Sequence, residues 1–137
     1  MIFIDTNILI DVFAPDQAWK IWSGLKLEEL NSSGGYVINT IVVAELATNF
    51  PSLAALTGSL QKIGIRIDPL EADVAFAAGE AFRAYRRRHG KRDAILSDFL
   101  IGAHALRLRA TLLTRDAGIY RTYFPGLTLI TPEDEHD

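Results

Sequence analysis

Short runs of β-branched and aliphatic residues alternate with longer helix-forming segments along the chain, and this alternation constrains the fold most. The runs predict five strands, at residues 2–5, 36–39, 65–68, 111–114 and 127–130. The segments between them are rich in Ala, Leu, Glu, Arg and Lys. Strands separated by helices predict a parallel sheet covered on both faces. The predicted fold class is therefore α/β, a three-layer α/β/α domain with a central, mostly parallel sheet of about five strands.

The clearest helical pattern covers residues 68–89. Asp68 is expected to cap this helix, with Pro69 in its first turn and Glu71 as the acid of a capping box. Gly90 is expected to end it. Apolar residues recur on one face of the segment, at Val74, Ala78, Ala81, Phe82 and Tyr85. The pattern predicts a long amphipathic helix between the third and fourth strands.

The length of the chain, 137 residues, suits one domain with a buried core. We see no repeat, low-complexity tract or linker, so we predict a single domain over residues 1–137. No apolar run approaches the roughly 18 residues that span a bilayer, and the first segment resembles a strand rather than a secretory signal. The absence of cysteine excludes a disulfide framework and a thiolate metal site. We expect a cytoplasmic protein without membrane contact.

The first apolar run, MIFIDTNILIDVF, is interrupted by Asp5, Thr6 and Asn7. One interpretation is a helix cap, because all three side chains accept hydrogen bonds from the free N–H groups at a helix start. The other is a catalytic or metal-binding carboxylate at the carboxyl end of a strand, where open α/β sheets bind their ligands. This stretch alone does not decide between them.

Three further acids do not fit their surroundings. Glu45 is the only charge in TIVVAELATNF, Asp98 begins the apolar segment DFLIGAHALRL, and Asp116 follows ATLLTR just past a strand. Each has an ordinary explanation. Asp98 alone could be a first-turn acid favoured by the helix dipole, and Glu45 could be a solvated residue on a mostly buried helix.

Together the four acids favour a metal site, because the predicted topology brings them to one edge of the sheet. Asp5 and Asp116 each end a strand, and the helices that carry Glu45 and Asp98 begin at the same edge. Like charges so placed would raise one another's pKa unless a divalent cation held them. Oxygen ligands favour Mg²⁺ or Mn²⁺ over Zn²⁺. We therefore predict a Mg²⁺ (or Mn²⁺) site in this cleft.

Five segments in order carry a family resemblance: FIDTNILID, VVAEL, SDFLIGAHA, LLTRDAGIYRTYF and PGLTLITP. The chain resembles the PIN-domain ribonucleases over nearly its whole length, and most of all the VapC-like toxins of bacterial and archaeal toxin–antitoxin modules. Two residues depart from the family pattern: His104 stands where a smaller residue is common, and Arg115 follows Thr114 directly. Neither departure removes an acid.

The resemblance implies the roles of particular residues. It implies that the acidic cluster is both catalytic and metal-binding, and that neighbouring polar side chains support it. The cluster consists of Asp5, Glu45, Asp98 and Asp116, and the supporting residues are Thr6, Asn7 and Thr114.

The resemblance also implies an endoribonuclease that hydrolyses RNA and leaves 3′-hydroxyl and 5′-phosphate ends. Metal ions would lower the pKa of the attacking water and stabilise the charge that develops on the phosphate, so no side-chain nucleophile is required. The implied partners are the RNA substrate, a cognate antitoxin protein and a second copy of the chain in a homodimer.

Basic residues cluster in RRRHGKR, although the formal net charge of the chain is −3. The run is either a solvated helix end, favoured by the helix dipole, or a patch for the RNA backbone. The candidate RNA contacts are Arg86, Arg87, Arg88, Lys91, Arg92 and Arg115. The pair Trp19 and Trp22, three residues apart, is expected to pack in the core rather than to line a groove for a partner.

Alternative functions remain open at this stage. A haloacid-dehalogenase-like phosphatase also starts with a strand that ends in Asp, but it needs a second acid where Asn7 stands. A phospho-acceptor receiver domain would use Asp68, yet LTLITP shows no Lys after the last strand. A catalytically silent PIN-like binding module would not need all four acids.

Overall fold

The computed structural model describes residues 1–15, 17–89 and 95–135. Its centre is a five-stranded sheet in the order β3-β2-β1-β4-β5, in which every paired strand is parallel. The strands are β1 (Ile2–Ile4), β2 (Tyr36–Asn39), β3 (Ile65–Asp68), β4 (Thr111–Leu113) and β5 (Leu129–Ile130). All five predicted strands are confirmed, although β5 is shorter than expected.

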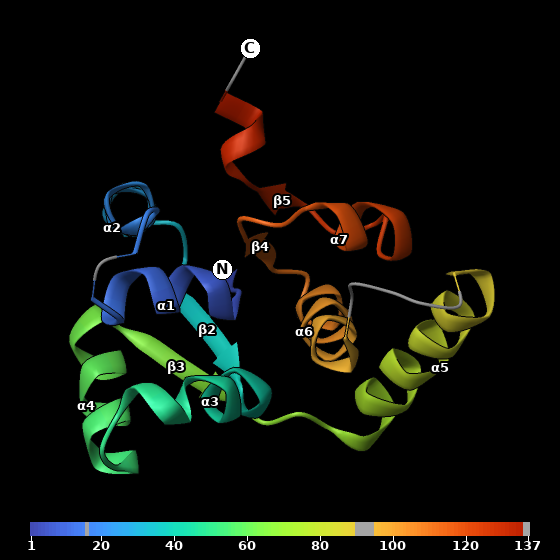
Figure 1. Ribbon diagram of the computed structural model, residues 1–137, viewed down its shortest axis with the longest axis horizontal. Helices are drawn as coiled ribbons and strands as arrows, with labels where there is room; N and C mark the ends of the chain where they lie inside the picture. Colours follow the sequence, from blue (N-terminus) through green and yellow to red (C-terminus); the bar gives the residue numbers. More distant parts are fainter. Residues whose placement is uncertain (16, 90–94, 136–137) are drawn as a thin grey trace.

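Helices connect the strands in sequence order. They are α1 (Thr6–Phe13), α2 (Lys20–Glu29), α3 (Thr40–Leu46), α4 (Leu53–Ile63), α5 (Ala72–His89), α6 (Leu96–Arg107) and α7 (Gly118–Tyr123), with short 3₁₀ turns η1 (Ala47–Asn49) and η2 (Pro132–Glu135). Right-handed crossovers place α1–α4 over one face of the sheet and α5–α7 over the other. In Figure 1 the first group accordingly lies on the left and the second on the right. The predicted α/β/α fold is confirmed.

The strand order reverses at β1. The chain runs outward from β1 through β2 to β3, and then crosses back to β4 on the other side of β1. Helices on the two sides of this point belong to opposite faces, which leaves a crevice above the carboxyl ends of β1 and β4. Open α/β sheets bind their ligands at such a point. The residues that follow β1 and β4 are therefore the first place to look for a functional site.

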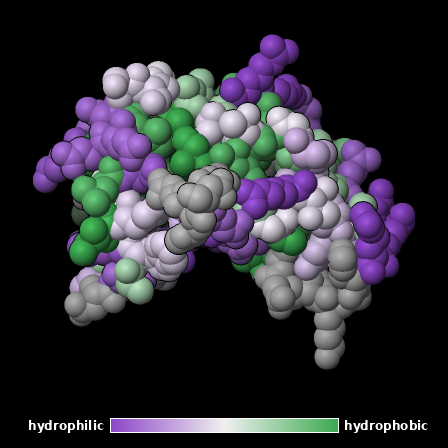
Figure 2. Space-filling view, turned by 90° about the horizontal axis from the view of Figure 1, so that it is seen from above, coloured by the Kyte–Doolittle hydropathy of each residue, from purple (hydrophilic) through white to green (hydrophobic). Residues whose placement is uncertain are grey.

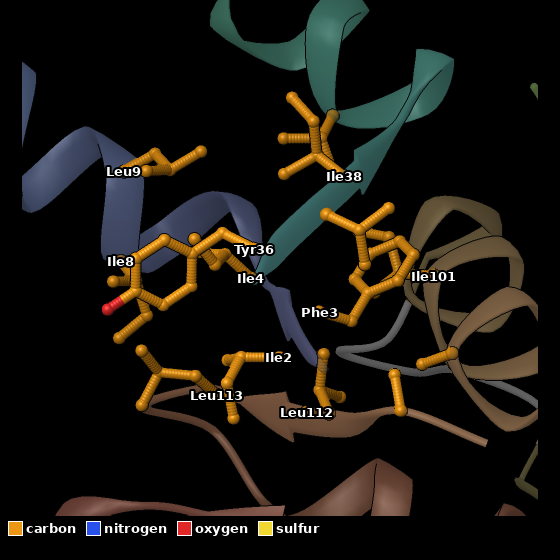
Figure 3. Packing of buried hydrophobic residues seen from close by; sticks show 14 of the residues in the cluster. Ile2, Phe3, Ile4, Ile8, Leu9, Tyr36, Ile38, Ile101, Leu112 and Leu113 are labelled. Carbon is orange, nitrogen blue, oxygen red and sulfur yellow. The ribbon is translucent and has the colours of Figure 1, made fainter. Parts of the chain in front are cut away.

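The hydrophobic core is built around the two central strands. Phe3, Ile4, Leu112 and Leu113 are fully buried, as expected for strands covered on both faces. Figure 3 shows them between side chains from α1, β2 and α6. Burial of such side chains contributes about 1.5–3 kcal/mol each to stability. The strand ends at the crevice are thus held by a rigid, apolar base.

The predicted start of the long helix is wrong by about one turn. The helix α5 begins at Ala72, and Asp68 is instead the last residue of β3, where it pairs with Asn39 of β2. Its carboxylate accepts hydrogen bonds from Arg66 and His104 rather than from a helix terminus. The predicted apolar face is confirmed, since Val74, Ala78 and Tyr85 are buried and Ala81 and Phe82 pack on the core. The predicted stop at Gly90 lies outside the described residues.

No single helix among the described residues is long and apolar enough to cross a membrane. The bent pair formed by residues 40–49 and 53–63 passes the same test by length and composition only.

Candidate functional site

Asp5 caps a helix and also lies at the carboxyl end of a central strand, the positions that the two interpretations of the opening motif require. It is the N-cap of α1, where its Oδ1 accepts a hydrogen bond of 2.8 Å from the backbone N–H of Thr6. Its Oδ2 accepts from the hydroxyl groups of Thr114 and Tyr120, at 2.7 and 3.0 Å. Its own N–H donates to the carbonyl of Leu113, which ties the ends of β1 and β4 together. Asp5 therefore lies at the crevice between the central strands.

The surroundings of Asp5 disfavour its charge. The residue is only 5% exposed, and burial raises the pKa of its carboxyl to about 6, against the lowering effect of the hydrogen bonds from Thr114 and Tyr120. The negative charge of Asp98 raises this pKa further. An acid that stays partly protonated near neutral pH is typical of functional sites.

Glu45 and Asp98 face the same crevice from two helices. Glu45 lies in the second turn of α3, and its carboxylate accepts hydrogen bonds from Thr6 Oγ1 at 2.6 Å and Ser97 Oγ at 3.1 Å. Asp98 lies in the first turn of α6 and accepts from the N–H of Ile95. Burial raises the pKa of Asp98, and the charges of Glu45 and Asp116 raise it further. The helices α3 and α6 thus bring two acids close enough for the charge of one to raise the pKa of the other.

The loop after β4 brings in Asp116. The Thr114 hydroxyl, which donates to Asp5, accepts a hydrogen bond of 3.0 Å from the N–H of Asp116. Asn7 donates to Asp5 and Thr114 at 3.5 and 3.4 Å, while its amide oxygen accepts from the N–H of Arg115. Asp116 itself is exposed. The polar residues predicted to support the acids therefore do contact them or the loop that carries them.

The four acids differ from several other acids of the chain in what they contact. Asp11, Asp68, Asp73 and Glu133 each form an ion pair with an arginine. Within residues 1–15, 17–89 and 95–135, no Lys or Arg forms an ion pair with a member of the cluster. Asp5, Glu45 and Asp98 instead accept hydrogen bonds from hydroxyl, amide and backbone N–H groups. The cluster thus concentrates carboxylates that no cation among the described residues neutralises.

The donor set fits a hard divalent cation, which prefers carboxylate and hydroxyl oxygens. Among the described residues, however, no three Asp, Glu or His side chains are grouped closely enough to hold one ion. The indication for a cation is therefore the uncompensated charge and the raised pKa values of Asp5 and Asp98, rather than a finished coordination shell.

Arg115, predicted as an RNA contact, forms an ion pair with Asp11 through its guanidinium group. Its Nε and Nη2 donate to the two carboxylate oxygens at 2.7 and 3.1 Å, and Ser23 Oγ donates to one of them at 2.7 Å. Asp11 is 1% exposed, so the pair compensates a buried charge. The guanidinium also lies over the ring of Trp19, 5.7 Å from its centroid. The residue next to Asp116 thus ties the β4–α7 loop to α1 and α2.

Three of the other predicted RNA contacts lie at the end of α5 and are exposed: Arg86, Arg87 and Arg88. Arg86 lies over the ring of Phe82, and Arg88 over the ring of Tyr123 in α7, each at 5.9 Å. Gly79, Phe82, Arg83, Arg86 and Arg87 line a cavity of about 410 Å³. Lys91 and Arg92 lie outside the described residues. The basic end of α5 is therefore beside α7, the helix whose Tyr120 holds Asp5.

The two tryptophans have different environments. Trp22 packs against the core as predicted, but Trp19 precedes α2 and is 39% exposed. Ile21 and Leu25 of α2 are also exposed, by 78% and 60%. Figure 2, which looks down from above, shows hydrophobic residues at the surface beside hydrophilic ones.

Sequence reasoning missed two residues that contact the cluster. Tyr120 follows Asp116 by four positions and reaches back to Asp5, and Ser97 precedes Asp98 and donates to Glu45. No local pattern gave the contact of Tyr120, because Asp116 lies before α7 and Tyr120 meets Asp5 only through the tertiary fold.

Comparison with known proteins gives one family. The profile of the family described as PIN domain matches residues 2–125. No curated protein sequence matches the chain.

Solved structures share the whole fold. VapBC2 from Rickettsia felis, bound to a DNA fragment from its promoter, has 26% identity and a TM-score of 0.69, and covers 96% of this chain and 98% of its own. FitAcB from Neisseria gonorrhoeae has 26% identity and a TM-score of 0.64 over 97% and 99%. The Mycobacterium tuberculosis toxin VapC20, named as cleaving the sarcin–ricin loop, has 18% identity and a TM-score of 0.66 over 96% and 100%. That last likeness supports the fold alone.

Proposed function

Because this chain belongs to the PIN domain family, we propose that it is the toxin of a toxin–antitoxin module and a metal-dependent endoribonuclease. Its single domain would hydrolyse RNA phosphodiester bonds with Mg²⁺ or Mn²⁺. The neighbour VapBC2, at 26% identity over nearly the full length of both chains, supports the module assignment.

One observation carries the catalytic part of the proposal: four carboxylates at the switch point of the sheet lack a cationic partner among the described residues, whereas Asp11 nearby has one. Burial of an uncompensated carboxylate such as Asp5 is costly, and carboxyl groups whose pKa is raised by burial and neighbouring charge are typical of functional sites. A positive ligand that binds there would relieve the repulsion.

Asp5, Glu45, Asp98 and Asp116 are the residues that would hold the cation. When bound, it supplies a water of lowered pKa and stabilises the negative charge that develops on the phosphate. The protein's own contribution is orientation. Hydroxyl groups of Thr114 and Tyr120 fix one carboxylate oxygen of Asp5, and those of Thr6 and Ser97 fix the two oxygens of Glu45.

The partner proteins are proposals of the same kind. We expect a cognate antitoxin whose segment at the acidic crevice carries an Arg or Lys, because such a side chain can take the place of the metal's positive charge. We also expect a homodimer, as the resemblance to VapC-like toxins implies.

The choice between an RNA substrate and a phosphate monoester distinguishes the proposed ribonuclease from a phosphatase. Purified protein with Mg²⁺ is incubated with single-stranded RNA and, separately, with a small phosphate monoester. We expect RNA fragments with 5′-phosphate and 3′-hydroxyl ends and no turnover of the monoester. Turnover of the monoester with intact RNA would favour the phosphatase instead, and a protein that binds RNA without cutting it would be the silent binding module.

The basic end of α5 gives a prediction about binding. If Arg86, Arg87 and Arg88 each neutralise a phosphate, the triple Ala variant should bind single-stranded RNA with a salt dependence whose slope is shallower by about 2. Titrations at several salt concentrations measure this slope. The exposed Lys62 of α4 provides a control, since Lys62→Ala should leave the slope unchanged. An unchanged slope in the triple variant would mean that these arginines do not bind RNA phosphates and form only a solvated helix end.

A further inference from the structure

A chain of hydrogen bonds crosses the base of the site through His104. The amide oxygen of Asn39 accepts from the N–H groups of Ile41 and Val42, both at 3.1 Å, and so caps α3. The Asn39 amide nitrogen lies 3.1 Å from His104 Nδ1, and His104 Nε2 lies 2.8 Å from Asp68 Oδ2. Asn39 is fully buried and His104 is 2% exposed. Every polar atom of these two side chains thus has a partner.

The partners assign the direction of each bond. Because the Asn39 oxygen is used by the helix cap, its NH₂ group faces the imidazole and must donate, so Nδ1 accepts. Nε2 then carries the proton and donates to Asp68. That bond holds the pKa of Asp68 below its usual range, with help from Arg66. The arrangement requires the neutral Nε2–H tautomer of His104.

This chain of bonds joins the two helices that carry acids. Asn39 begins α3, whose second turn holds Glu45, and His104 lies in α6, whose first turn holds Asp98. Asn39 and Asp68 are register partners at the ends of β2 and β3, so the imidazole also spans two strand ends. One buried side chain thereby links α6 to α3 by directional bonds, in addition to the hydrogen bond from Ser97 of α6 to Glu45 of α3.

We propose that His104 is a positioning residue of the acidic site: through Asn39 it sets the placement of Glu45 relative to Asp98. The expected effect of His104 on RNA cleavage rests on the proposed function. Its ring also packs on Phe3, with centroids 5.6 Å apart, so the test must separate packing from hydrogen bonding.

Three variants separate these roles. His104→Phe keeps a ring in the core but loses both hydrogen bonds. His104→Asn keeps an acceptor near the position of Nδ1, and His104→Gln keeps a donor near the position of Nε2. The control is Ile101→Val in the same helix, which removes a buried methyl group without touching the network.

We expect His104→Phe to lower kcat and the affinity for Mn²⁺, measured without RNA, by about 10- to 100-fold, as for residues that orient metal ligands. KM for RNA should stay unchanged. His104→Asn should recover most of both losses and His104→Gln little, because the bond to Asn39 is the part of the His104 network that links α6 to α3. Nitrogen NMR of the wild type should show a protonated Nε2 and an unprotonated Nδ1.

The outcomes are distinct. A folded His104→Phe protein with unchanged kcat and Mn²⁺ affinity would overturn the inference and leave the proposed function standing, as would losses matched by Ile101→Val. A protonated Nδ1 in the wild type would also overturn it. A wild-type protein that neither binds Mn²⁺ nor cleaves RNA would refute the proposed function, and with it the role of His104.

Discussion

Asp5→Asn is expected to reduce RNA cleavage by several orders of magnitude while the protein remains folded. Asn caps a helix about as well as Asp, so the start of α1 should survive. The hydroxyl groups of Thr114 and Tyr120 can each accept as well as donate, so they can pair with an amide at position 5. What disappears is one negative charge from the cluster proposed to hold a cation. Cleavage of single-stranded RNA with Mg²⁺ measures the loss.

The same substitution should raise the stability of the folded protein relative to wild type, although it lowers activity. The folded-state pKa of Asp5 is about 6, above its ordinary value of 3.8, so the folded protein keeps a proton that the unfolded chain loses. The contribution of Asp5 to wild-type stability therefore falls as pH rises from about 4 to about 6. Asp5→Asn lacks this contribution, and its stability relative to wild type should rise by up to about 3 kcal/mol across that window. Urea unfolding at several pH values measures the difference.

The matched control for Asp5→Asn is Asp73→Asn, which removes an exposed acid that is paired with Arg107 and makes no contact with the acidic cluster. It should leave both cleavage and the pH dependence of stability near wild type. Full activity in Asp5→Asn would reduce Asp5 to a helix cap and remove the nuclease proposal. Lost activity with an equal or higher melting temperature in the absence of metal supports it.

Removal of divalent metal is expected to stop RNA cleavage completely without unfolding the protein. The cluster has no paired base or side-chain nucleophile to replace the ion's chemistry, and the core does not depend on it. EDTA should abolish cleavage, and added Mg²⁺ or Mn²⁺ should restore it. Circular dichroism should show an unchanged fold throughout. Undiminished cleavage in EDTA would contradict the metal mechanism.

Binding of the metal ion can also be measured without RNA cleavage, through the melting temperature of the protein. A ligand that binds only the folded state stabilises it, by about 2.7 kcal/mol at a concentration of 100 Kd. Mn²⁺ should therefore raise the melting temperature of the wild type. The rise should be much smaller in Asp98→Asn, because the cluster has then lost one charge. Equal shifts in the two proteins would mean that the ion binds elsewhere.

Most of the fold was predictable because its signals are local. Each strand is a short apolar run, and alternation with helices implies parallel pairing and helices on both faces. The start of α5 was not predictable in the same way. Asp68-Pro69-Leu70-Glu71 has the composition of a helix cap, but pairing of Asp68 with β2 and bonding to His104 decided its conformation. Tertiary contacts there outweighed local preference.

The acids were predictable for a topological reason. Asp5 and Asp116 follow strands, and residues after parallel strands share one edge, so their convergence follows from the element order alone. The identity of their partners does not. Asp11 lies in the same apolar run as Asp5 and, like Asp5, follows an isoleucine. Its charge is nevertheless neutralised by Arg115, which is 104 positions away in the chain.

The strands, their parallel pairing and the edge at which carboxylates gather could thus be predicted from the chain, since they depend on periodicity and on the alternation of strands with helices. Only the tertiary structure decided which charges are compensated. Tyr120 reaches Asp5 across 115 positions, and His104 joins the ends of β2 and β3. A hydrogen bond forms wherever folding brings donor and acceptor within about 3 Å, and no local pattern in the chain records that meeting.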